Sequence, residues 1–140
     1  MKKEFKISQM IALEGIEYHY DLHNDYDLVE CIHNQDGSSV ELLFTKTKGD
    51  WVKESDPSNI KIIFSALHYF KISEDFSKNF SKNIEDIGYK PSEDFDYDFL
   101  VPEEQADESF HLVFMFENNG YIRVFADEVK IVTPSEGHQN

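Results

Sequence analysis

The sequence predicts an α+β fold, in which a predominantly antiparallel β-sheet meander carries one main α-helix packed on it. Two observations favour this class. Apolar residues recur mostly with a period of two, as in strands, and one stretch near residues 73–87 repeats them at helical spacing. With 140 residues the chain fits a single domain, 1–140, built around one core. The polar stretch 133–140 is expected to be a flexible tail.

The first half of the chain is expected to form a β-hairpin followed by a central strand. Residues 28–33 and 40–45 are rich in apolar side chains, and the tetrapeptide Asn34-Gln35-Asp36-Gly37 joins them. Its Asp-Gly pair favours the positive φ angles of a hairpin turn. From residue 60 to residue 69 apolar side chains occur on both faces, which predicts a strand that is covered on both sides.

The helix is predicted to begin after Ser73, a good N-cap residue that is followed by two acids. Gly88 would end it, or it would end near Asn83 and leave residues 84–89 extended. An apolar stripe at helical spacing would face the sheet and is formed by Phe76, Phe80, Ile84 and Ile87.

The end of the chain carries the clearest structural pattern, a closing hairpin. Apolar residues alternate over 110–116, Asn118-Asn119-Gly120 turns the chain, and 121–126 returns. A bulge or bend is expected at Asp127-Glu128 before an extended run over 129–132. The residues of this hairpin that we expect to be buried are Phe110, Phe114, Ile122 and Val124.

The chain is strongly acidic, with 28 Asp and Glu against 13 Lys and Arg and a formal net charge of −15. Its 40% hydrophobic and 14% aromatic residues are sufficient for a packed core, so the charge is expected on the surface of a folded domain. Such a surface repels phosphates, which argues against direct nucleic-acid binding, and it attracts basic proteins.

A cytoplasmic protein is the expectation from two further features. Cys31 is the single cysteine, so an intramolecular disulfide is impossible and a reducing compartment is indicated. No apolar run has the length of a signal-peptide core or of a membrane span, so no membrane partner is expected.

The strongest candidate for a binding surface lies between Pro91 and Glu108. This stretch contains eight acids, no base and several aromatic residues. A block of like charges is most often a solvated loop, but the interleaved aromatics could act as interface anchors. The residues predicted to contact a partner are Glu93, Asp94, Asp96, Tyr97, Asp98, Phe99, Glu103, Glu104, Asp107, Glu108 and Trp51.

Three patterns could carry chemistry, and each is weak. The alternating set Glu17, His19, Asp21 and His23 has metal-binding residue types, but strand spacing separates neighbouring ligands too widely. Residues 94–98 resemble the start of a calcium loop that then lacks its glycine and its final Glu. Cys31 has no activating base nearby in sequence except His33. We therefore predict no metal, no cofactor and no enzymatic activity.

In its general features the chain resembles the immunity proteins of bacterial toxin–immunity systems. The features are its size and acidity, the hairpin around Asn34-Gln35-Asp36-Gly37, one helix near 73–84 and the closing hairpin 110–132. The resemblance implies a protein that binds and neutralises one cognate toxin, often a basic nuclease. The resemblance assigns no role to any individual residue of this chain. Two alternatives remain: a DNA mimic that inhibits a basic DNA-binding protein, and a small ligand-binding or enzymatic domain.

Overall fold

The protein is nearly all β in the computed structural model, which describes residues 1–34, 36–47, 56–73 and 82–133. Its strands run in chain order as β1 (Lys2–Lys3), β2 (Lys6–Ser8), β3 (Ala12–Glu14), β4 (His19–Asp21), β5 (Tyr26–His33), β6 (Ser39–Lys46), β7 (Asn59–Ile72), β8 (Ile84–Lys90), β9 (His111–Phe116) and β10 (Tyr121–Val132), with the short 3₁₀ helix η1 (Glu103–Gln105) between β8 and β9. No helix in these described ranges is long and apolar enough to cross a membrane.

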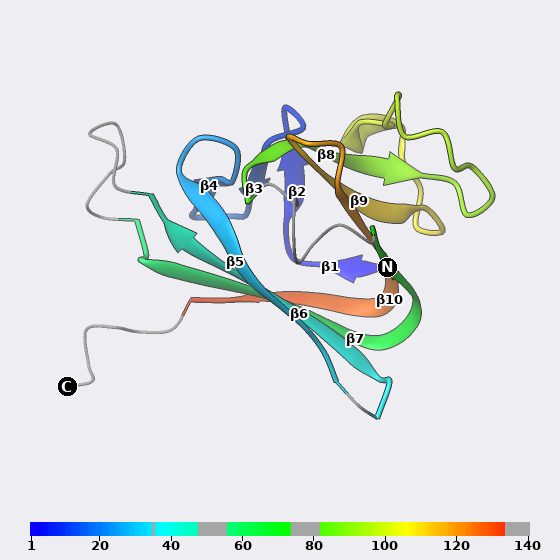
Figure 1. Cartoon of the computed structure of the whole chain (residues 1–140), viewed down its shortest axis with the longest axis horizontal. Coiled ribbons are helices and arrows are strands. Elements are labelled where there is room, and N and C mark those ends of the chain that lie inside the picture. Colours follow the sequence, from blue (N-terminus) through cyan, green and yellow to red (C-terminus); the bar gives the residue numbers. More distant parts are fainter. Residues whose placement is uncertain (35, 48–55, 74–81, 134–140) are drawn as a thin grey trace.

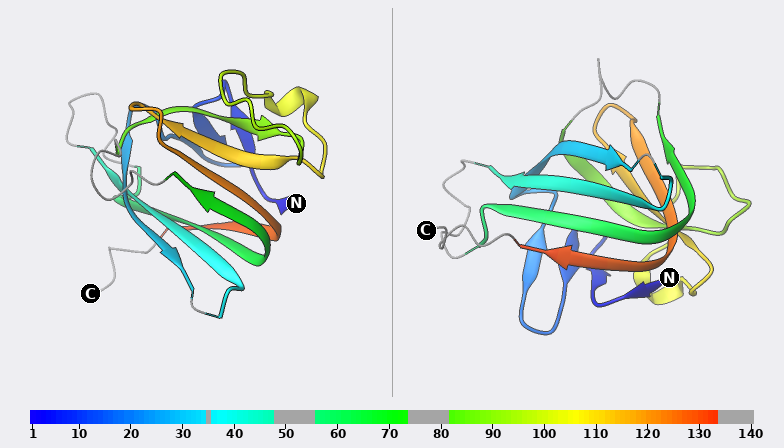
Figure 2. Two further views of the ribbon diagram at one scale, coloured as in Figure 1. Left: turned by 45° about the vertical axis from the view of Figure 1, so that its right-hand side comes forward. Right: turned by 90° about the horizontal axis from the view of Figure 1, so that it is seen from below.

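One large sheet dominates the molecule. Its strands follow the order β5-β6-β7-β10-β9-β8, all antiparallel, and the short β1 adds to β10 in parallel. Strand β10 pairs with β7 from Ile122 to Val132 and with β9 over its first residues, Tyr121 to Val124. Figure 1 shows how the sheet curls, so that β8 and β9 stand above the β5–β7 layer. The result is a half-barrel, and Figure 2 shows its strands from two further sides.

The curl has identifiable local causes. The register between β7 and β10 shifts at Phe125/Ala126, close to Ala66, whose φ of 57° lies in the left-handed region. A bulge of this kind bends a strand and increases its twist. At the far end the half-barrel nearly closes, because the backbone N–H of Leu28 in β5 donates to the carbonyl of Lys82, just before β8, at 3.0 Å.

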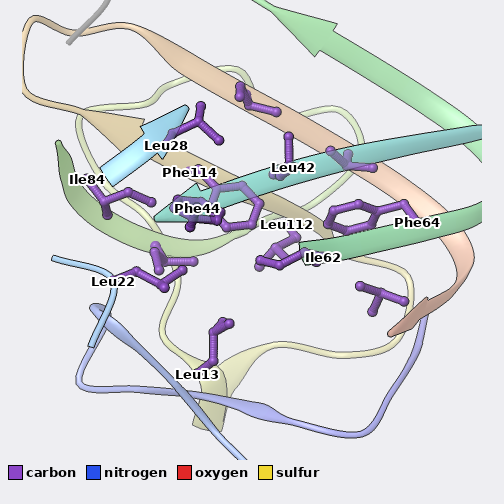
Figure 3. Packing of buried hydrophobic residues seen from close by; sticks show 14 of the residues in the cluster. Leu13, Leu22, Leu28, Leu42, Phe44, Ile62, Phe64, Ile84, Leu112 and Phe114 are labelled. Carbon is purple, nitrogen blue, oxygen red and sulfur yellow. The ribbon is translucent and has the colours of Figure 1, made fainter. Parts of the chain in front are cut away.

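The core fills the concave side of the half-barrel. The small sheet β2-β3-β4 covers that side, and its Leu13 joins Leu22 in facing the large sheet (Figure 3). Phe64 and Phe114 meet edge to face in the centre, with ring centroids 6.4 Å apart. Both side chains are fully buried. The core is therefore apolar and lies between two sheets.

The predicted α+β class is wrong, because the fold is nearly all β and the described residues contain no α-helix. Residues 74–81 of the predicted helix lie outside the described residues. The rest of the predicted apolar stripe, Ile84 and Ile87, belongs to strand β8 instead. A small β-sheet covers the large one where a helix was expected.

A β-bulge explains why β8 resembles a helix in sequence. Ile84 pairs with Phe116 and Asp86 pairs with Met115, so Glu85 is an extra residue in β8. The bulge lets both Ile84 and Ile87 face the core although they are three residues apart, which is a helical spacing. The alternative that residues 84–89 are extended is confirmed.

Gly88 does not end a helix but lies within β8. A Cβ built there would come within 2.7 Å of Leu100 Cβ and 3.0 Å of the Val101 carbonyl oxygen. The glycine therefore permits the chain after β8 to return along the edge of this strand, where Val101 exchanges two backbone hydrogen bonds with Tyr89.

Both predicted hairpins are confirmed. Strands β5 and β6 pair around Gly37, whose φ of 77° has the predicted sign. Strands β9 and β10 pair across a turn in which Asn119 has a φ of 67°. Phe114, Ile122 and Val124 are fully buried as predicted, whereas Phe110 is half-buried at the margin of the core.

Strand β7 lies between β6 and β10, as its pattern predicts, but only its inner face is deeply buried, since Ile63 on the outer face is half-exposed. The expected irregularity near Asp127 falls at Phe125/Ala126, and β10 continues through it. Of the predicted tail 133–140, residues 134–140 lie outside the described residues.

Candidate functional site

The predicted binding stretch forms the connection between β8 and β9. We call residues 91–108 the acidic segment; it is drawn yellow-green to yellow in Figure 1. Leu100 is buried and Val101 pairs with β8, so the segment is attached to the sheet near its middle. Residues on either side of this attachment then fold against two different parts of the molecule.

The first half of the acidic segment is held by Arg123, the only arginine of the chain. Arg123 lies between two core residues of β10, Ile122 and Val124, so strand alternation places its side chain on the opposite face of the sheet. There the guanidinium donates to the backbone carbonyls of Asp94 at 2.7 Å, of Pro91 at 3.0 Å and of Ser92 at 3.2 Å, and to the Tyr97 hydroxyl at 3.0 Å.

Aromatic rings and a histidine complete the surroundings of this guanidinium. Its central carbon lies 4.6 Å from the Phe95 ring centroid and 5.5 Å from that of Tyr69. Its Nε donates to His111 Nδ1 at 2.9 Å. Burial, followed by the charge of Arg123, lowers the pKa of His111 from 6.5 to about 4, so the ring is neutral and accepts this bond at pH 7. Arg123 is thus fully buried and held by neutral acceptors and ring faces.

The second half of the acidic segment is attached through Glu103. Its carboxylate accepts from the Tyr89 hydroxyl at 2.6 Å and from the Ile7 backbone N–H at 2.8 Å, and it forms an ion pair with Lys3 at 3.4 Å. Burial and this hydrogen bond to Glu103 raise the pKa of Tyr89 strongly. One carboxylate therefore joins strands β2 and β8 to η1, and it faces the interior.

Alternate acids also shape the backbone in the first half of the acidic segment. The Asp94 carboxylate accepts from the Asp96 N–H at 2.9 Å, and the Asp96 carboxylate accepts from the Asp98 N–H at 3.0 Å. These are Asx turns. The Asp96 N–H is the main cause that lowers the pKa of Asp94, assisted by the Lys90 ammonium at 3.3 Å. The acidic segment is thus an ordered part of the fold.

The structure divides the residues predicted to contact a partner into two groups. Asp94, Tyr97 and Glu103 are half-buried and make the internal bonds described above. The exposed group consists of Glu93, Asp96, Asp98, Phe99, Glu104, Asp107 and Glu108. Asp107 also accepts from the N–H and hydroxyl of Ser109, the hydroxyl bond being the main cause that lowers its pKa. Trp51 lies outside the described residues.

Two phenylalanine rings are the most unusual exposed groups of the acidic segment. Phe95 is 58% exposed and Phe99 is 70% exposed. Phe95 lies against the Arg123 guanidinium, and the Lys90 ammonium lies 5.9 Å from the Phe99 ring centroid. Phe95 and Arg123 were not among the residues predicted from the sequence to contact a partner. For Arg123, the available signal in the sequence was its position between two apolar residues of a predicted strand.

The other candidate sites do not assemble in the described part of the chain. No three His, Cys, Asp or Glu side chains within it converge as a metal ion requires. His23 Nδ1 contacts the Ile84 carbonyl, and Asp21 accepts from the backbone of the turn that follows it. Burial raises the pKa of the Cys31 thiol to about 11, and His33 packs on the Phe70 ring at 4.9 Å. A protonated thiol is a poor nucleophile.

Comparisons of the chain with protein-family models, with curated proteins and with solved structures gave no match.

Proposed function

We propose that this chain is a binding protein rather than an enzyme, and that the exposed face of the acidic segment binds a basic protein. The observation that carries the proposal is the pair of exposed rings, Phe95 and Phe99, among carboxylates on an ordered segment. Exposed aromatic side chains in a folded protein favour an interaction surface.

The order of the acidic segment supports the same function. A disordered acidic loop would lose conformational entropy on binding, whereas this one is already fixed by Arg123 and Glu103. Its carboxylates can steer a basic partner and raise the association rate, and the rings can slow dissociation once they are desolvated. Long-range charge and local apolar contact thus have separate roles.

In biological terms we infer an immunity protein that neutralises a basic, nuclease-type toxin in the cytoplasm. Carboxylates can occupy the subsites that a nuclease uses for phosphates, and this matches the net charge of −15. A DNA mimic would need carboxylates spaced regularly over the surface. Glu103 turns inward instead, which favours a local patch. The protonated Cys31 thiol argues against an enzyme based on that residue.

The experiment is co-expression with a candidate basic toxin, followed by binding kinetics at low and high salt. In one variant Glu93, Asp98 and Glu104 are reversed to Lys, because all three are exposed. We expect association to slow by about ten-fold or more at low salt and its salt dependence to flatten. Phe99→Ala should mainly speed dissociation.

The matched control reverses three exposed acids elsewhere: Glu14, Glu30 and Glu128. It changes the net charge equally and leaves the acidic segment intact. If both triple variants slow association to the same extent, total charge and not this face steers the partner. Full protection and wild-type kinetics in the Glu93/Asp98/Glu104 variant would remove the segment from the interface.

A further inference from the structure

A pocket of about 360 Å³ lies beside the acidic segment, on the outer face of the large sheet. Its walls come from four places that are distant in sequence: β8, the acidic segment, β9 and the turn into β10. The residues that line it are Glu85, Asp86, Tyr97, Asp98, Met115, Asn119 and Tyr121. Its volume falls within the range of about 300–1,000 Å³ that is usual for ligand pockets.

The bulge in β8 is responsible for the charge of this pocket. In a regular strand Glu85 and Asp86 would point to opposite faces. Because Glu85 is the extra residue of the bulge, both acids are exposed and line the same cavity. Asp98 adds a third carboxylate from the acidic segment. No ion pair involves these three acids among the described residues.

The remaining walls consist of two tyrosine rings, the Met115 side chain and the polar side chain of Asn119. Tyr97 and Tyr121 stack with ring centroids 4.4 Å apart and an interplanar angle of 27°. The Tyr97 hydroxyl accepts from Arg123, so the ring pair is fixed in place. Met115 contributes a polarisable thioether. Fixed aromatic rings and a thioether beside carboxylates favour a cation that is flat and weakly hydrated.

We propose that this pocket binds the guanidinium group of an arginine side chain. The proposal deepens the function inferred above and rests on it, since the arginine would belong to the basic partner. A metal ion fits less well, because the carboxylates do not converge as a cation site in the described residues. A guanidinium presents five N–H donors in a plane and can use carboxylates on several sides while it stacks on a ring. A lysine ammonium lacks that plane.

The test uses ethylguanidinium as the probe, titrated into the full chain and followed by NMR of the backbone amides and the Met115 methyl group. We expect saturable shifts at Asp86, Asp98 and Met115 in the millimolar range. Butylammonium, which has the same charge without the plane, should bind several-fold more weakly. Equal binding of the two probes would overturn the assignment to arginine.

A neutral variant with Glu85→Gln, Asp86→Asn and Asp98→Asn should weaken ethylguanidinium binding by about ten-fold, as expected for three exposed ion pairs. All three side chains are exposed, so the fold should persist, which the denaturation midpoint verifies. The control neutralises Glu14, Glu30 and Glu128 and should keep wild-type binding. Equal loss in the two variants, or shifts spread over the whole acidic surface, would overturn the pocket.

These probes contain no protein partner, so the two proposals fail separately. If ethylguanidinium does not shift the pocket residues while reversal of Glu93, Asp98 and Glu104 still slows toxin association, the pocket inference is wrong and the proposed function stands. If the pocket binds ethylguanidinium but the toxin associates equally well with the Glu93/Asp98/Glu104 variant, the proposed function is wrong and the assignment of the pocket as a guanidinium site stands.

Discussion

The two faces of strand β10 are covered in different ways. On the inner face Ile122 and Val124 pack into the hydrophobic core under the small sheet. On the outer face the residue between them, Arg123, is equally buried, but under the acidic segment. The inner cover depends on many interchangeable apolar contacts. The outer cover depends on the hydrogen bonds of one side chain.

This difference predicts which substitutions the molecule tolerates and which it does not. Apolar packing tolerates changes of shape when volume is conserved, because no single contact is directional. A buried guanidinium must satisfy its donors, and its removal leaves several acceptors without partners at once. The first half of the acidic segment is therefore expected to keep its shape only as long as Arg123 is present. Substitutions at three positions test this comparison.

The inner face should show the largest effect. Phe114→Ala removes a fully buried ring that contacts Phe64, and it should lower the free energy of unfolding by about 3–5 kcal/mol. Urea denaturation measures the change. The control is Met115→Ala, the next residue of β9, which is only half-buried and faces outward. Equal losses from the two variants would show that the two faces of β9 contribute alike.

The outer face should respond locally. Arg123→Met keeps an apolar stem of similar length but removes every donor to the acidic segment, so stability should fall by about 2–3 kcal/mol. Chymotrypsin should then cleave after Phe95, Tyr97 or Phe99 many times faster than in the wild type, while core amides stay protected from hydrogen exchange.

Arg123→Lys retains the charge but not the planar fork, and it should give an intermediate cleavage rate. An unchanged cleavage rate in Arg123→Met would show that the acidic segment is held by something other than this guanidinium.

The third expected effect is a pH dependence that belongs to the outer face, and per pH unit it is the smallest of the three. The pKa of His111 is lowered from 6.5 to about 4 in the folded protein. Between these values the unfolded chain binds a proton that the folded chain does not. Titration of His111 therefore leaves the free energy of unfolding unchanged above about pH 6.5. As the pH falls from 6.5 towards 4, protonation of the unfolded chain lowers this free energy by at most about 1.4 kcal/mol per pH unit.

His111→Asn places an amide oxygen near the Nδ1 position, so it can still accept from Arg123 but cannot titrate. Urea denaturation at a series of pH values should show a flatter profile for this variant between pH 6.5 and 4. His19→Asn, at an exposed position, serves as the control and should keep the wild-type slope. Parallel profiles for all three proteins would exclude His111 as the source.

The same contrast explains which parts of the fold could be predicted. The closing hairpin was predictable because its alternation is regular and its turn is local, so Phe114 and Ile122 were placed correctly. Strand β8 was not predictable, because the extra residue Glu85 changes the spacing between its core-facing residues from two to three. The acids of 91–108 were recognised as a group, but their division into exposed and inward-facing ones was not.

Composition and local pattern were sufficient to predict the surface charge, the two hairpins and the apolar identity of the core. The remaining features depend on contacts between residues far apart in the chain, which only folding brings together. It placed Glu103 against Ile7, 96 residues away, and Arg123 against Pro91, 32 residues away. The physical reason is that a polar side chain is buried only where partners converge on it, and long-range strand pairing brings those partners together.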